Sequence, residues 1–245
     1  MSLEHGQVPP AEPGPTPALG EHAASPTPVQ LRLQILSTEH WSLLASRGLA
    51  WNESFTRASM FLSTLSGSIV ALSLIGGVDG FHDPFFVVAL VVLPVDLFVG
   101  IGTWLRMGAA NYHDAIAVAG MNRIRAAYLE IAPDLAPYFV MGVHDDAAGI
   151  GITMAVPPGT APLVHLIAGT PTLVMVLNAV LSGAIVALAL TRVAGTELLL
   201  TVAVAVAVAA VVLAFEVSSA RGKIIRSQRA LQAMFPTPAD DQARV

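Results

Sequence analysis

Four long apolar blocks dominate the pattern of hydrophobic and polar positions along this chain. They cover residues 58–78, 84–106, 171–191 and 197–218. A helix of about 20 residues, rising about 1.5 Å per residue, crosses a hydrocarbon core about 30 Å thick, so each block is long enough to span a bilayer. The last block alternates Val and Ala as a strand does, but its length favours a spanning helix. The pattern predicts an all-α integral membrane protein with four transmembrane helices.

Helical patterns continue beyond three of these blocks and predict long cytoplasmic extensions. Residues 30–57 form an amphipathic helical segment, in which Ser37 or Thr38 can cap the helix that runs into the first span without a break. The second span continues into the segment 107–169, and the fourth into a basic helix within 219–245. Measured from the turn at residues 79–83, the first two extensions have similar lengths. We therefore expect an antiparallel hairpin of two long helices with a cytoplasmic stalk.

The first extension carries an apolar seam at spacings of three and four residues, formed by Trp41, Leu44, Gly48, Trp51 and Phe55. The seam predicts a packing face against another cytoplasmic helix. A helix lying in the membrane surface is the alternative, and it is disfavoured because the opposite face is not rich in Lys and Arg.

The remaining segments follow from their composition. Residues 1–29 are rich in Pro, Gly, Ala and Glu and predict a disordered tail without a cleavable signal sequence. The transmembrane hairpins occupy residues 58–106 and 170–218. Between them, Pro and Gly residues predict an irregular loop, and residues 160–169 predict a short interfacial or re-entrant helix.

Composition and charge narrow the class of protein further. Hydrophobic residues make up 54% of the 245 residues and charged residues only 12%, against about 25% charged in soluble domains. The net charge of −5 and the absence of Cys argue against nucleic-acid binding, disulfides and thiolate chemistry. One Lys beside eleven Arg, with abundant Ala and Val, is typical of a bacterial chain from a high-GC genome. No catalytic or cofactor motif occurs, so neither enzyme activity nor a cofactor is predicted.

The distribution of Lys and Arg predicts the orientation. Eleven of the twelve cations lie in the N-terminal region, the middle loop or the C-terminal region, and only Arg192 lies in a short turn between spans. Because cations are retained on the cytoplasmic side, we expect a multi-pass protein of the cell (plasma or inner) membrane with both termini in the cytoplasm.

Asp96 is the leading candidate for chemistry. It lies 13 residues past the outer turn, or about 20 Å into the core, where a charge costs about 2.5–3.5 kcal/mol. Pro94 leaves a backbone carbonyl without its helical partner and predicts a kink beside the acid. A cation or proton site is one interpretation. The other is a neutral Asp96 hydrogen-bonded to Ser66, Asn178 or Ser182.

Small polar residues accompany Asp96 within the spans. Ser63 and Ser66 belong to a hydroxyl-bearing face of the first span, and Asn178 and Ser182 lie one turn apart on the third. Helix packing explains both sets, since small and amide side chains join helices in lipid. The alternative is a polar pathway that also uses Asp96 and Pro94.

Charged residues are predicted at the cytoplasmic ends of the spans. Arg57, Arg106 and Glu216 should lie at similar depth and form an interfacial ion pair, or else a charged ring at a pore mouth. A basic run follows the fourth span and either contacts anionic lipid or sets the orientation alone; it comprises Arg221, Lys223, Arg226 and Arg229.

Two His/Asp clusters are weak candidates for a metal site. They are His113-Asp114 and His144-Asp145-Asp146, and they would bind metal only if the fold brought them together. Such clusters arise easily by chance, so solvated polar groups are the expected state and no metal is predicted.

These observations support two functions. The first is an oligomeric ion channel or a proton or cation pathway that uses Asp96. The second is a non-catalytic membrane scaffold or accessory subunit that binds a cytoplasmic protein partner through its stalk. Both imply contact with the lipid bilayer, and a homo-oligomer is expected because one four-helix protomer leaves little room for a pore.

Overall fold

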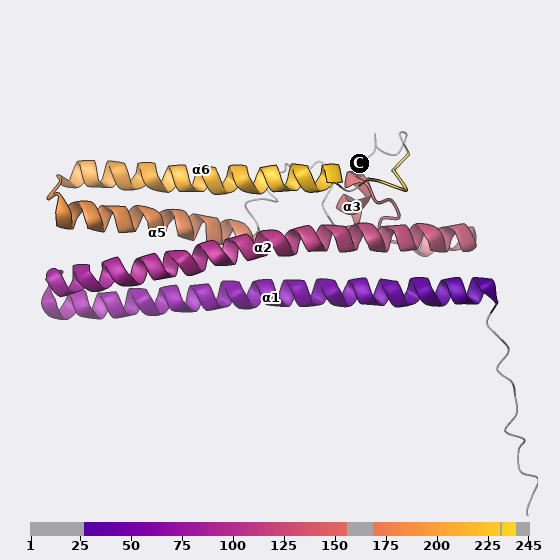
Figure 1. The fold of residues 1–245 in the computed structure, drawn as a ribbon, viewed down its shortest axis with the longest axis horizontal. Helices are drawn as coiled ribbons and strands as arrows, with labels where there is room; N and C mark the ends of the chain where they lie inside the picture. The colour runs from indigo at the N-terminus through magenta and orange to yellow at the C-terminus, as the bar shows by residue number, and fades with distance from the viewer. Residues whose placement is uncertain (1–26, 156–168, 231, 239–245) are drawn as a thin grey trace, which may run out of the picture.

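The chain folds into two antiparallel helical hairpins that lie side by side (Figure 1). The computed structural model describes residues 27–155, 169–230 and 232–238, and every regular element among them is helical. The first hairpin comprises α1 (Pro28–Asp79) and α2 (Asp83–Ile131), and the second comprises α5 (Thr170–Val193) and α6 (Leu198–Ala230). The predicted all-α fold with four long apolar helices is confirmed.

Helix α1 is a single helix of 52 residues that begins earlier than predicted. Thr27 caps it: its hydroxyl accepts a hydrogen bond from the N–H of Gln30, whose side chain accepts one from the N–H of Thr27. This reciprocal cap, followed by Pro28 in the first turn, starts the helix about ten residues before Ser37. The prediction that Ser37 or Thr38 caps the helix is therefore wrong. The Thr38 hydroxyl instead donates to the carbonyl of Gln34 within the helix (2.8 Å).

A tight turn connects α1 to α2. Gly80 has a φ of 72° and ends α1 in the left-handed conformation that glycine adopts without steric cost. Helix α2 then begins with Asp83 and Pro84 and continues for 49 residues, with Pro94 inside it. Two long antiparallel helices thus extend well beyond the predicted spans. We call residues 28–57 and 107–131 the stalk.

Helix α2 occupies the centre of the bundle, because it packs against both α1 and α5. The core that joins the three helices consists of large apolar side chains and a few alanines. Its members include Phe61, Leu65 and Leu72 of α1, Ala89, Leu93, Trp104 and Met107 of α2, and Val174, Met175 and Leu181 of α5.

Helices α5 and α6 pair closely along their length. A Cβ on Gly183 would lie 2.7 Å from the backbone carbonyl oxygen of Ala205, so the two backbones approach as only a glycine permits. Gly195, with a φ of 56°, lies in the short turn between the helices. Small residues that bring backbones together are typical of helix pairs in lipid.

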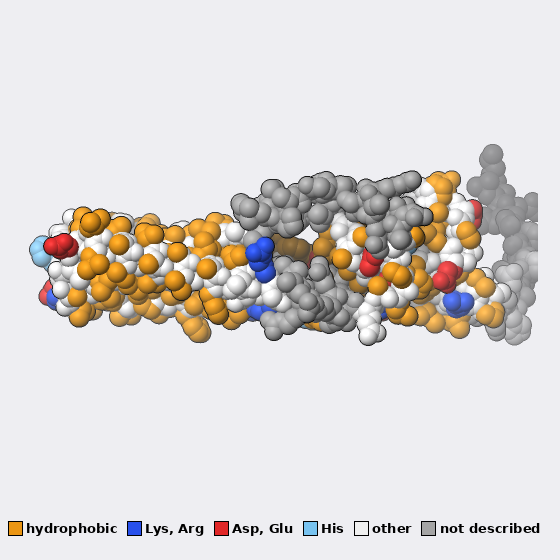
Figure 2. Space-filling view, turned by 90° about the horizontal axis from the view of Figure 1, so that it is seen from above, with side chains coloured by type: hydrophobic (Ala, Val, Ile, Leu, Met, Phe, Trp, Pro, Cys, Tyr) orange, Lys and Arg blue, Asp and Glu red, His pale blue; other side chains and the backbone are white. Residues whose placement is uncertain are grey.

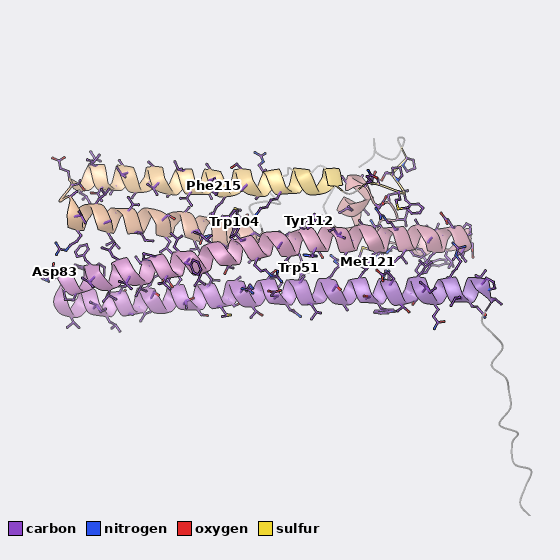
Figure 3. The ribbon with its side chains drawn as sticks, in the orientation of Figure 1. Trp51, Asp83, Trp104, Tyr112, Met121 and Phe215 are labelled. Atoms are coloured by element: carbon purple, nitrogen blue, oxygen red, sulfur yellow. The ribbon has the colours of Figure 1, made fainter. Side chains whose placement is uncertain are left out.

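Each of the four long helices contains a stretch that is long and apolar enough to cross a membrane. Figure 2, viewed from the α6 side, shows charged side chains at the turn end and Lys or Arg near the middle, with an uncharged band between them. Figure 3 gives landmarks along this axis: Asp83 lies at the turn end, Trp104 and Phe215 near the middle, and Trp51, Tyr112 and Met121 on the stalk. The length and composition of the four helices indicate a multi-pass membrane protein.

Short elements pack against the stalk. The 3₁₀ helix η1 (Pro133–Tyr138) follows α2, and α3 (Ala147–Thr153) lies against it. The predicted disordered tail, apart from its last residues, and the predicted short helix at 160–169, apart from Gly169, lie outside the described residues.

The predicted apolar seam of the stalk faces away from α2. Trp41 is 67% exposed and Phe55 50% exposed, and Leu44 and Trp51 are exposed as well. The face of α1 that contacts α2 instead carries Leu43, beside Gly120, and the buried Ser54. The prediction that the seam packs against another helix is therefore wrong for the helices that the structure describes. The reason is that α2 packs on the next face of α1, where Leu43 lies against Gly120 and Arg47 binds Asp114.

Candidate functional site

Polar side chains from three helices are buried inside the part of the bundle that is apolar enough to cross a membrane. We call Asp96, Asn178, Ser182 and Glu216 the intramembrane polar cluster. Asp96 and Glu216 are each 3% exposed, and Asn178 is fully buried. The Asn178 side-chain N–H donates to Glu216 Oε1 at 3.0 Å, and the Ser182 hydroxyl donates to the backbone carbonyl of Asn178 at 2.8 Å.

Gly100 sets the register between α2 and α5 at this cluster. A Cβ on Gly100 would collide with Asn178 Oδ1 and would lie 2.8 Å from the ring of Phe61. The Asn178 carbonyl therefore rests directly on the backbone of α2, where any larger residue would push it away. Gly100 is thus a positioning residue for the cluster.

The same register places Asp96 beside the part of α5 that lies nearer the turn end. Asp96 lies one turn from Gly100 toward the turn end, and Ser182 lies one turn from Asn178 toward that same end. Asp96 comes 13 residues after the start of α2, about 20 Å along the axis, and Glu216 18 residues after the start of α6, about 27 Å. The two carboxyl groups therefore lie at successive depths within the bundle.

The cluster leaves several oxygens without hydrogen-bond partners. Within the described part of the chain, Asp96 Oδ2, Asn178 Oδ1 and Glu216 Oε2 are buried and accept no hydrogen bond. An unsatisfied buried polar group costs about 1–3 kcal/mol, and more when it is charged. A proton on either carboxyl group would remove the larger cost of burying a charge.

The predicted hydrogen bonds of Asp96 are not formed. Ser66 is exposed on α1, Asn178 bonds to Glu216, and Ser182 bonds within its own helix. Ser63 is exposed on α1 as well, so the two predicted serines do not join the cluster. Pro94, two residues before Asp96, leaves the carbonyl of Leu90 without its usual helical donor.

Glu216 does not form the predicted interfacial ion pair. Arg57 and Arg106 both bind Glu53 instead: Arg106 donates two hydrogen bonds of 2.9 and 2.6 Å, and Arg57 one of 3.0 Å. The hydrogen bonds from Arg106 first, and from Arg57 second, lower the pKa of Glu53 to about 2. Glu53 lies on the α1 face beside α2, where both guanidinium groups reach it, whereas Glu216 points into the bundle.

At the end of the stalk, the predicted His/Asp clusters are engaged in other contacts. Arg47 binds Asp114 at 2.5 Å, and Arg123 binds the fully buried Asp145 at 2.6 Å. No group of three or more His, Cys, Asp or Glu residues in the described segments is placed to hold a metal ion. The weak hypothesis that His113, Asp114, His144, Asp145 and Asp146 converge on a metal is therefore wrong, because arginines and backbone amides take up the carboxylates.

Asp145 and Asp146 fasten the C-terminal segment to the stalk. Asp145 accepts hydrogen bonds from the backbone N–H groups of Met234 (2.9 Å) and Phe235 (2.8 Å). Asp146 accepts one from the N–H of Thr237 (2.9 Å) and one from its hydroxyl (2.7 Å). We call Arg123, Asp145, Asp146 and the segment 234–237 the polar clamp.

The pKa values of the clamp carboxyls are lower than usual. Burial alone would raise the pKa of Asp145, but the hydrogen bonds from Met234, Phe235 and Arg123 outweigh it. For Asp146, burial is likewise outweighed by the hydrogen bonds from Gly149 and Thr237.

Next to the clamp, the buried Asn122 donates to the carbonyl of His144 (2.7 Å) and accepts from Thr153 (2.8 Å). In the sequence, only the adjacent acids Asp145 and Asp146 within the predicted irregular loop hinted at this network.

The basic run after the fourth span begins at the level of Trp104. Lys223 Nζ lies 5.0 Å from the centre of the Trp104 ring, in a cation–π contact. Arg221 is exposed. The side chains of Arg226 and Arg229 lie outside those that the structure describes. A lysine and a tryptophan at one level are typical of a membrane–water interface.

Comparison with known proteins adds no family to this description. No family model, no curated protein and no solved structure matches the chain. Its class therefore rests on the four candidate spans alone, whose length and composition indicate a multi-pass membrane protein. Any more specific function must come from the intramembrane polar cluster and the stalk.

Proposed function

We propose that this protein provides a pathway for protons or monovalent cations across a membrane, with the intramembrane polar cluster as its binding site. The observation that carries the proposal is the burial of Asp96 Oδ2, Asn178 Oδ1 and Glu216 Oε2 without hydrogen-bond partners in the described residues. Ionisable residues inside a membrane are costly, and they mark ion pathways and proton relays by default.

The arrangement suits a carrier of protons or small cations on chemical grounds. A protonated carboxyl group becomes a donor and can pass its proton to a neighbouring carboxylate, as in the relays of pumps and transporters. Carboxylate and amide oxygens also bind hard cations. Asp96 and Glu216 lie at successive depths, with Asn178 between their helices, so an ion moving along α5 would meet the two acids in turn.

The experiment that tests this proposal is a flux measurement in proteoliposomes. We expect proton or monovalent-cation flux in the wild-type protein, and at least a tenfold loss in both Asp96→Asn and Glu216→Gln. The matched control is Glu53→Gln, which removes a carboxylate outside the predicted spans and should leave flux unchanged. Flux that is equal in all four proteins, or absent from folded wild-type protein, would contradict the proposal.

The alternative function is a scaffold or accessory subunit, in which the cluster serves only to join helices. The exposed aromatic residues of the stalk favour it, since large apolar side chains in water mark interaction surfaces. In that case flux would be absent, and replacing Trp51 would abolish capture of a partner. The flux measurement therefore separates the two functions.

We further propose that the stalk lies in the cytoplasm of a bacterial cell, with both termini on that side. The distribution of Lys and Arg supports this orientation. The chain contains no Cys, so a single cysteine at Phe81 or at Gln34 can be labelled by a membrane-impermeant reagent in intact cells. We expect labelling only at Phe81, and labelling only at Gln34 would reverse the orientation.

A further inference from the structure

One face of α1, from Trp41 to Gly77, has no partner among the residues that the structure describes. Its positions recur at spacings of three and four residues with a mean of 3.6, so they form a straight line along about ten helical turns. We call it the α1 outer face: Trp41, Leu44, Gly48, Trp51, Phe55, Ser59, Leu62, Ser66, Val70, Ser73 and Gly77. All of these residues are exposed except Leu62, which is half-buried.

The outer face changes character where α1 enters the predicted span. The part in the stalk is aromatic and apolar, with Trp51 and Phe55 stacked at 5.7 Å between ring centres. In the part within the span, four of the six positions are serine or glycine, and the other two are Leu62 and Val70. Large apolar side chains in water need a covering partner, and small residues in lipid allow another helix backbone to approach. Both halves of the face therefore indicate that a second helix packs along it.

The outer face is compatible with a copy of itself. None of its residues is charged. A two-fold axis parallel to two membrane helices places each residue near its own copy, and here it would bring no like charges together. Ser59, Ser66 and Ser73 also recur every seven residues, a spacing that keeps one side of a helix turned toward a parallel partner.

The length of the face also indicates that its partner is a second copy of the chain. Helix α1 has 52 residues, or about 78 Å of helix, and the face continues from the stalk into the predicted span. A partner that covers it must cross the membrane and project from the same side by a similar length. A second copy inserted in the same orientation meets both conditions.

A groove beside the face offers space for the partner's side chains. It has a volume of about 860 Å³ and lies at the junction of stalk and span. Phe55, Ser59 and Ser63 of α1 line it, together with Val99 of α2. Phe55 of a second copy would meet this groove at the same level.

We propose that the protein is a parallel dimer in which the α1 outer faces of two copies pack against each other from Trp41 to Gly77. This interface is separate from the intramembrane polar cluster, which faces α5 and α6. The proposal therefore does not depend on ion translocation, and a protein without flux would still form the dimer.

Cysteine cross-linking in native membranes tests the proposal directly, because the chain has no Cys of its own. Leu44→Cys and Ser66→Cys place one thiol in each half of the face. Val91→Cys on α2 and Val211→Cys on α6 are matched controls, since both residues are more than 60% exposed away from the face. We expect a disulfide-linked dimer at both face positions, at least fivefold more abundant than at the controls.

A second measurement guards against chance collisions. Leucine suits a lipid-facing position, so Ser59→Leu with Ser66→Leu should not harm a monomer, but it would hold two helices apart at a close interface. We expect this double variant to lower the dimer fraction in liposomes at least tenfold, counted by single-molecule photobleaching, with unchanged helix content. Equal cross-linking at controls, an unaffected dimer in the double variant, or cross-links to a different membrane protein would overturn the proposal.

Discussion

The intramembrane polar cluster buries the carboxyl groups of Asp96 and Glu216, and the polar clamp holds a buried Asp145 beside a half-buried Asp146, but the two sites differ in how these groups are satisfied. In the clamp, Asp145 accepts hydrogen bonds from Arg123 and from two backbone N–H groups. In the cluster, Asp96 Oδ2 and Glu216 Oε2 have no partner among the described residues. A fully satisfied buried network stabilises one structure, whereas an unsatisfied one is a cost that the fold retains for another reason.

The comparison also shows why charge alone does not identify a functional site. The sequence around Asp145 and Asp146 carries more acidic and imidazole groups than any predicted span, yet those groups hold the C-terminal segment in place. Glu216 is the one acidic residue in the apolar stretch 198–218, and among the described residues it accepts a hydrogen bond only from Asn178. The following predictions test this difference, beginning with the largest expected effect.

The largest effect is expected for Asp145→Ala in the clamp. Removing one partner of a buried ion pair typically costs about 3–5 kcal/mol, and here two backbone N–H groups also lose their acceptor. We expect a loss of about 3 kcal/mol in the stability of the stalk end, measured by hydrogen exchange of residues 232–238. The control is Asp134→Ala, because Asp134 is exposed. Unchanged exchange in Asp145→Ala would show that the clamp contributes little.

A smaller loss is expected for Gly100→Ala at the cluster. Its Cβ would meet Asn178 Oδ1 and the Phe61 ring, and overpacking a core costs about 1–3 kcal/mol. Thermal unfolding in detergent measures the loss, and Gly102→Ala is the control, because a Cβ at Gly102 meets nothing within 4 Å. If both variants unfold alike, the close contact between α2 and α5 is not a constraint on the fold.

The clamp should loosen in acid. The pKa values of Asp145 and Asp146 are lowered from an ordinary 3.8, so their ionised forms stabilise the folded state. This contribution is complete at a pH above the ordinary value and is lost as the pH falls through the lowered folded values. We expect residues 232–238 to become sensitive to an acid protease as the pH falls below about 4. Sensitivity that is constant with pH would contradict this prediction.

The smallest effect on stability is expected where the effect on flux is largest. Asp96→Asn and Glu216→Gln replace carboxyl groups that each have one oxygen without a partner by neutral isosteres. The free energy of unfolding should therefore change by less than about 1 kcal/mol, or should rise. Thermal unfolding beside the flux assay measures both. A large loss of stability in either variant would mean that the carboxyl group is structural, as in the clamp, and the contrast between the two sites would fail.

Much of the fold could be predicted from local patterns. The two hairpins were predicted from the lengths and apolar content of the four blocks. The long helices α1 and α2 were predicted from the unbroken helical pattern that runs from stalk to span. Hydrophobic length and helical periodicity are properties of neighbouring residues, and a bilayer requires each span to satisfy its own backbone. The burial of Asp96 followed for the same reason, since a carboxyl group within an apolar span is expected to face the protein.

Only the tertiary structure decided which faces of these helices meet. The aromatic seam from Trp41 to Phe55 was predicted to pack on a neighbouring helix, yet α2 packs on the adjacent face and leaves the seam exposed. Glu216 was predicted to pair with Arg57 and Arg106 at similar depth, but the rotation of α6 about its axis directs the Glu216 side chain toward Asn178. Sequence spacing fixes how residues are arranged around one helix, whereas the rotation of each helix against its neighbours depends on close contacts such as Gly100 on Asn178 and Gly183 on Ala205.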